Sequence, residues 1–64
     1  METRTTKIKR RLEKGGWYLA RHGSSHDIYR HQDIRGIITL PRHRTVSPRV
    51  ARSIASKAQW RDDE

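Results

Sequence analysis

Residues 17–31 read WYLARHGSSHDIYRH, and this stretch decides the fold. A Gly-Ser-Ser turn occupies positions 23–25, because glycine reaches positive φ without steric cost and serine hydroxyls bond the nearby backbone. The segments on both sides carry aromatic and β-branched side chains, which suit a pleated surface. The stretch therefore predicts a β-hairpin with strands over about residues 17–21 and 26–31.

Side chains alternate between the two faces of a strand, so neighbours in the second strand point to opposite sides. Ile28 and Tyr29 are both apolar, and the pattern alone does not say which of them faces inward. If Tyr29 faces the helices, then His26, Ile28 and Arg30 share the outer face of the sheet.

A third strand follows the hairpin. Residues 37–40 are Ile-Ile-Thr-Leu, which suit a strand. A turn that closes on Gly36 precedes them, and Pro41 follows and ends the strand, since proline has no amide proton to donate. Such short connections between consecutive strands predict an antiparallel meander.

A first helix is predicted before the hairpin. Thr3 or Thr5 can serve as its N-cap, and the Gly-Gly pair at residues 15–16 ends it after about residue 14. Ile8 and Leu12 lie four residues apart and form its buried side. Lysine and arginine cover the rest, either as a solvated face or as a surface that contacts phosphate.

The second helix has the clearest start in the chain. Ser47 is a good N-cap and Pro48 occupies the first helical position, where its missing amide proton costs nothing. The helix is expected to continue to about residue 59. Its apolar stripe, with helical spacing, consists of Val50, Ala51, Ile54, Ala55 and Ala58.

The order of elements is therefore α-β-β-β-α. We expect an α+β fold in which two helices cover one face of a three-stranded antiparallel sheet and the other face stays open. The 64 residues form one domain, 1–64, with a small core, because 31% of them are hydrophobic. Since no apolar run is long enough for a signal peptide or a membrane span, we expect a cytoplasmic protein.

Charge restricts the possible partners. The chain has 15 lysines and arginines against 7 acidic residues, a net charge of +8. Phosphate polyanions are the natural ligands of such a protein. A membrane surface would require a long amphipathic helix with a bulky apolar face, which neither predicted helix has. With no cysteine, the chain has neither a disulfide nor a thiolate nucleophile.

Four pieces of the sequence, taken in order, resemble the HicA toxins. They are LEKGGW at residues 12–17, GSSH at 23–26, TLPRH at 39–43 and the closing helix, and the resemblance runs from residue 7 to about residue 60. HicA toxins are small ribonucleases of bacterial toxin–antitoxin pairs with a fold like the double-stranded-RNA-binding domain. The resemblance implies that the chain cleaves mRNA, that a HicB-like antitoxin neutralises it, and that His26 is the catalytic residue.

The residue types fit this chemistry. RNA carries its own nucleophile, the 2′-OH, so cleavage requires an acid, a base and positive charge but no metal or cofactor. Histidine is both neutral and charged near pH 7, which suits His26 for general acid–base work. His22 lies across the hairpin and can assist, but an ordinary strand-end residue is the preferred interpretation. His31 is five residues along the strand and points to the opposite face. His43 is a second candidate for a general acid or an RNA contact.

Basic residues near the hairpin, the loop after it and the second helix are the predicted contacts to RNA phosphates. They are Arg21, Arg30, Arg42, His43, Arg44 and Arg49. The turn residues Gly23, Ser24 and Ser25 support the site. A zinc site of His22, His26 and Asp27 is the competing interpretation, but His26 and Asp27 are neighbours in a strand and point to opposite faces.

Two other functions compete with RNA cleavage. A non-catalytic RNA-binding module would have the same order of elements and the same basic charge. A small DNA-binding regulator would need a recognition helix after a tight helix–helix turn, and three predicted strands separate the helices here. A basic protein with a free strand edge also suits an acidic partner, and we expect the antitoxin to pair with that edge and mask His26.

Overall fold

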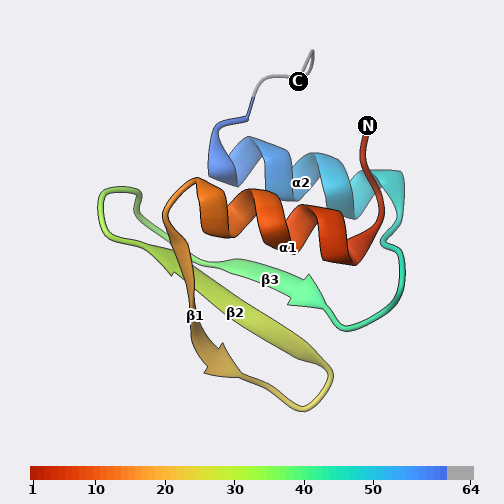
Figure 1. Cartoon of the computed structure of the whole chain (residues 1–64), viewed down its shortest axis with the longest axis horizontal. Coiled ribbons are helices and arrows are strands. Elements are labelled where there is room, and N and C mark those ends of the chain that lie inside the picture. Colours follow the sequence, from red (N-terminus) through yellow and green to blue (C-terminus); the bar gives the residue numbers. More distant parts are fainter. Residues whose placement is uncertain (61–64) are drawn as a thin grey trace.

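The computed structural model describes residues 1–60. Its elements are α1 (Thr5–Lys14), β1 (Trp17–His22), β2 (His26–His31), β3 (Ile38–Pro41) and α2 (Pro48–Ala58). The predicted α+β fold with α-β-β-β-α order is confirmed, and both helices lie on the same side of the sheet (Figure 1). The end of the hairpin formed by β1 and β2 extends beyond the helices. The last four residues of the predicted domain lie outside the described range.

The sheet is an antiparallel meander with the strand order β1-β2-β3, as predicted. β2 is central, so its residues pair on both sides: Tyr29 lies opposite Leu19 of β1 and Ile38 of β3. β3 begins one residue later than expected, and Pro41 does not end it early but is its last residue, opposite His26. Ile37 precedes it and is 41% exposed, because Ile38 is the residue that faces the core.

A β-bulge interrupts β1. Leu19 pairs with Tyr29, and the next pair is Arg21 with Ile28, which leaves Ala20 without a partner in β2. One extra residue shifts the alternation of side chains by one position. After the bulge, Arg21 therefore points to the outer face and His22 points to the helix side, the reverse of an unbroken strand.

One core joins the sheet to both helices. Tyr29 is its largest fully buried side chain, 1% exposed, and faces the helices. The core consists of Ile8, Leu12, Trp17, Tyr29, Ile38, Leu40, Val46, Ala51, Ile54 and Ala58. Two members of the predicted stripe on α2, Val50 and Ala55, are only partly buried, and Val50 packs against the edge of the core.

The predicted threonine cap of α1 is wrong. Arg4 occupies the N-cap position without a side-chain hydrogen bond, and Thr5 is the first helical residue. The threonines have other partners, since the Thr5 hydroxyl donates to the carbonyl of His43 and the Thr3 carbonyl accepts from the Val46 amide. The start of the chain therefore pairs with the segment between β3 and α2.

The predicted start of α2 is confirmed. The Ser47 hydroxyl accepts a hydrogen bond from the Val50 amide at 3.2 Å, and Pro48 follows the cap. The helix ends at Ala58, and Gln59 is left-handed with a φ of 63°. That conformation ends the helix one residue earlier than expected.

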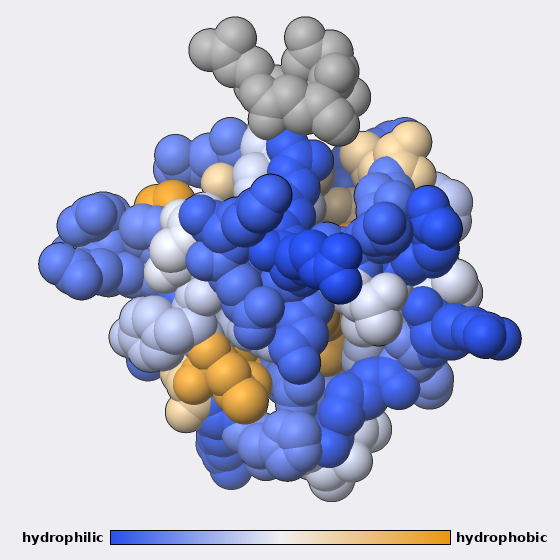
Figure 2. Space-filling view, in the orientation of Figure 1, coloured by the Kyte–Doolittle hydropathy of each residue, from blue (hydrophilic) through white to orange (hydrophobic). Residues whose placement is uncertain are grey.

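The face of the molecule shown in Figure 2 is mostly hydrophilic. The largest apolar group visible in this view lies over β1, where Leu19 is 49% exposed. Within residues 1–60, no helix has the length and apolarity needed to cross a bilayer.

The buried Tyr29 hydroxyl has no hydrogen-bond partner among the described residues. Burial raises the pKa of Tyr29, and the charges of Glu13 and Asp27 add to this effect. The folded protein therefore holds the phenol proton more tightly than the unfolded chain does. The free energy of unfolding should fall as the pH rises above about 10, the ordinary pKa of tyrosine.

Tyr29→Phe removes this ionisation and an unpaired polar group. We expect it to be neutral or to stabilise the protein by up to about 1 kcal/mol at pH 7 and to reduce the loss of stability at alkaline pH. Urea unfolding between pH 8 and 11.5 measures both effects. Tyr18→Phe is the matched control, because Tyr18 is 53% exposed. Equal alkaline losses in the parent and Tyr29→Phe would contradict the assignment.

Candidate functional site

The hairpin turn is closed by a hydrogen bond from the Gly23 amide to the His26 carbonyl at 2.9 Å. A Cβ atom at position 23 would lie 2.7 Å from that carbonyl oxygen, so only glycine fits there. A second hydrogen bond, from the Arg42 amide to the Ser25 carbonyl at 3.1 Å, ties the turn to the end of β3. One bond therefore holds the backbone of His26 to the start of the turn, and the other holds the preceding residue to the segment after β3.

His26 is the first residue of β2 and is partly buried. Its side chain lies on the outer face, opposite to Asp27 and Tyr29, as predicted for an inward Tyr29. The Ser25 hydroxyl is 3.4 Å from the His26 Nδ1, close enough to orient the ring. The imidazole faces an open pocket of about 240 Å³ that it shares with Arg21. A titratable ring and a cation therefore meet at an accessible site.

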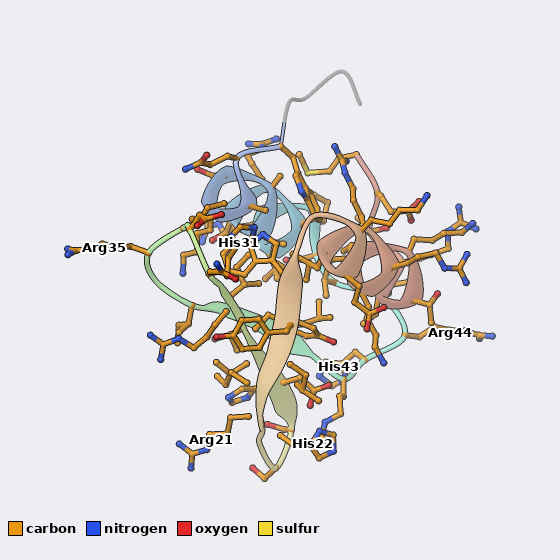
Figure 3. All side chains as sticks on the ribbon, turned by 60° about the vertical axis from the view of Figure 1, so that its left-hand side comes forward. Arg21, His22, His31, Arg35, His43 and Arg44 are labelled. Atoms are coloured by element: carbon orange, nitrogen blue, oxygen red, sulfur yellow. The ribbon has the colours of Figure 1, made fainter. Side chains whose placement is uncertain are left out.

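The structure separates the predicted phosphate contacts. Arg21 lies with His26, whereas Arg42, His43 and Arg44 line a larger groove on the helix side of the hairpin. Figure 3 shows Arg21 pointing to one side of the hairpin and His22 to the other, toward His43.

Two further predicted contacts lie away from the hairpin tip. Arg30 lines a small pocket at the turn after β2, a different pocket from that of His26. Arg49 is exposed in the first turn of α2 and lines neither the His26 pocket nor the larger groove.

His31 lies on the opposite face of the sheet from His26, as expected from the strand pattern, and its contacts are to other parts of the fold. Its Nδ1 accepts a hydrogen bond from the Asp33 amide at 2.9 Å, so Nε2 carries the proton and donates to the Gly15 carbonyl at 2.9 Å. The ring also packs edge-on against Trp17, with centroids 5.3 Å apart. His31 therefore joins the end of α1 to the sheet.

The family of the chain follows from its sequence. The pattern of the family described as the HicA toxin of bacterial toxin–antitoxin pairs matches residues 6–60, which include all five elements except the first residue of α1. The chain belongs to the HicA toxin family. It is thus the toxin of a toxin–antitoxin pair, and its partner is an antitoxin. A search of curated proteins finds no match.

Sequence reasoning missed a second cluster in this HicA toxin, formed by His22, Asp27 and Arg42. Asp27 Oδ1 is 2.7 Å from His22 Nδ1 and 3.5 Å from Arg42 Nε. Neither contact has the geometry of a hydrogen bond to Oδ1, so both are close electrostatic contacts. Arg42 Nη1 is 2.7 Å from His22 Nε2. Because a guanidinium only donates, Nε2 accepts, and a neutral His22 carries its proton on Nδ1, toward Asp27.

A signal for this cluster was present in the sequence. Asp27 is two residues from Tyr29, so an inward Tyr29 places the carboxylate on the same face. A carboxylate that is only 13% exposed requires positive partners. The bulge at Ala20 brings His22 to that face, and nothing comparable in the sequence marks this bulge. Among the described residues, no three His, Cys, Asp or Glu side chains are grouped to hold a metal ion.

Gly23→Ala tests whether the turn requires the close approach of the Gly23 backbone to the His26 carbonyl. Forcing a methyl group against the His26 carbonyl should destabilise the protein by about 1–3 kcal/mol. Gly15→Ala is the matched control, because its Cβ would meet only ordinary contacts at 3.5 Å and its φ of −84° suits alanine. Urea unfolding compares the two. Equal stability of the two variants would show that the turn does not need glycine.

Proposed function

We propose that this HicA toxin is a metal-independent endoribonuclease that cleaves mRNA in the cytoplasm, with His26 as its general acid–base residue. The observation that carries the proposal is the position of His26. The residue lies at the protruding end of the hairpin, its backbone is fixed by Gly23, and its ring shares an open pocket with Arg21. Membership of a toxin family supports the same assignment.

The proposed chemistry uses the nucleophile within RNA. Neutral His26 takes the proton from a ribose 2′-OH, and the freed oxygen attacks the adjacent phosphorus. The bond from phosphorus to the 5′-oxygen breaks, that oxygen takes up a proton from water, and His26 returns its proton to the solvent. The products are a 2′,3′-cyclic phosphate and a 5′-hydroxyl end. The guanidinium of Arg21 lies where it can offset the charge that develops on the phosphate.

The antitoxin partner is proposed to be HicB-like and acidic. β1 is an edge strand and therefore has unpaired backbone groups that another strand can bond. Its exposed side chains include Tyr18 and Leu19, and Arg21 adds positive charge on the outer face. An acidic protein that pairs with β1 would cover His26 across the turn.

His26→Ala should abolish cleavage of a long single-stranded RNA in the presence of EDTA. A single acid–base residue contributes about 10²–10⁴-fold to the rate, so we expect a loss in that range. Gel analysis between pH 5.5 and 8.5 should show a histidine-like pH profile in the parent only. His31→Gln is the matched control, a histidine of the same strand on the opposite face.

Cleavage by His26→Ala at the parental rate would contradict the assignment. A folded parent that binds RNA without cleaving it would instead support the non-catalytic RNA-binding module. In that case the affinity should fall steeply with salt, because binding releases counterions from the phosphates.

A HicB-like antitoxin should stop cleavage at an equimolar ratio and protect His26 from modification by diethyl pyrocarbonate. Leu19→Glu, on the exposed part of β1, should weaken the inhibition while cleavage by the free toxin is retained. Ile37→Glu is the matched control, since Ile37 is similarly exposed but lies outside the strands. Full inhibition of Leu19→Glu at the same ratio would argue against pairing at β1.

A further inference from the structure

We propose that the groove on the helix side of the hairpin is a second binding site, which holds RNA phosphates at Arg42. The proposal rests on RNA being the substrate, and it adds a subsite that the acid–base role of His26 does not require. The groove has a volume of about 840 Å³ and lies between the start of α1 and the segment after β3. Six basic side chains line it, namely Arg4, Lys9, His22, Arg42, His43 and Arg44.

The groove carries net positive charge, although Arg4 is paired with the Glu2 carboxylate at 3.1 Å. Asp27 is the single acidic residue among its lining residues, and it already contacts Arg42 and His22. Lys9 and Arg44 are exposed and pair with no acidic side chain among the described residues. An anion that enters the groove therefore meets uncompensated positive charge on both walls.

Arg42 is held in a position that suits a phosphate. Its Nε faces Asp27 and its Nη1 faces Nε2 of His22, so two sides of the guanidinium are fixed by neighbours. A guanidinium has five N–H donors, and these contacts leave the Nη2 donors without a partner among the described residues. The remaining donors can bind two oxygens of one phosphate, and the fixed side chain loses little entropy in doing so.

The start of α1 forms the opposite wall and also favours anions. Its first turn has no acidic residue and the Arg4 side chain makes no cap hydrogen bond, but the Glu2 carboxylate accepts from the Arg4 amide at 2.8 Å just before the helix. The Thr5 amide donates to the Arg44 carbonyl, whereas the Thr6 amide has no partner among the described residues. A free amide at the positive end of a helix dipole attracts negative charge, and Lys9 lies one turn further along.

The groove and the His26 pocket lie on opposite faces of one hairpin end. The Ala20 bulge and the strand alternation send Arg21 to the outer face and His22 to the groove (Figure 3). A single RNA strand that crosses this end can place one phosphate beside Arg21 and another on Arg42. The groove would then hold the substrate while His26 acts on the other side.

The test measures binding without cleavage. The probe is a short fluorescent 2′-O-methyl oligoribonucleotide, which has no free 2′-OH to attack its phosphates, and its affinity is measured by fluorescence anisotropy. Arg42→Gln should weaken binding roughly tenfold and reduce the slope of affinity against salt by about one phosphate contact. Arg35→Gln is the matched control, an exposed arginine at the other end of the molecule (Figure 3).

A second variant covers the possibility that Arg42→Gln disturbs the fold through Asp27. Lys9→Gln with Arg44→Gln removes two exposed charges of the same groove and should weaken binding to a similar extent. Parental affinity in this double variant, or an equal loss in Arg35→Gln, would overturn the proposal. Loss of binding in the groove variants supports the groove even if the parent fails to cleave RNA.

Discussion

The burial of Tyr29 is the constraint on which the rest of the structure depends. Its ring faces both helices from the central strand. Because side chains alternate along a strand, this fixes the face of the sheet on which each of the remaining β2 side chains lies. Asp27 and His31 lie on the covered face with it, and His26 lies on the open face. A shift by one residue would move the catalytic candidate into the core and leave the sheet without its central side chain.

The parts of the fold that local chemistry specifies could be predicted from the sequence. The Gly-Ser-Ser turn, the Ser47 cap followed by Pro48, and the spacing of Ile8 and Leu12 each act within a few residues, and the structure shows all of them. The predicted threonine cap of α1 was wrong because the contacts of Thr5 are not local. Thr5 has partners 38 residues or more along the chain, and no local pattern reports such a contact.

The candidate site was predictable only in part. The position of His26 at the start of β2 follows from the turn that precedes it, while its acid–base role remains a prediction. The cluster of His22 with Asp27 depends on the bulge, and Ala20 is neither a glycine nor a proline that would mark an irregular strand. An unbroken strand with Trp17 inside would point His22 outward. One unpaired alanine therefore decides which face of the hairpin receives this histidine.

The pairing of the first residues with residues 44–46 has a consequence for the way the protein is made. The wall of the groove contributed by α1 leaves the ribosome first, but its partners follow about forty residues later. Contacts so distant in the chain form late in folding, because a long loop must close before they contribute. The groove is therefore among the last features of residues 1–60 to assemble, and a nascent toxin stays without it until residues 43–46 have been synthesised.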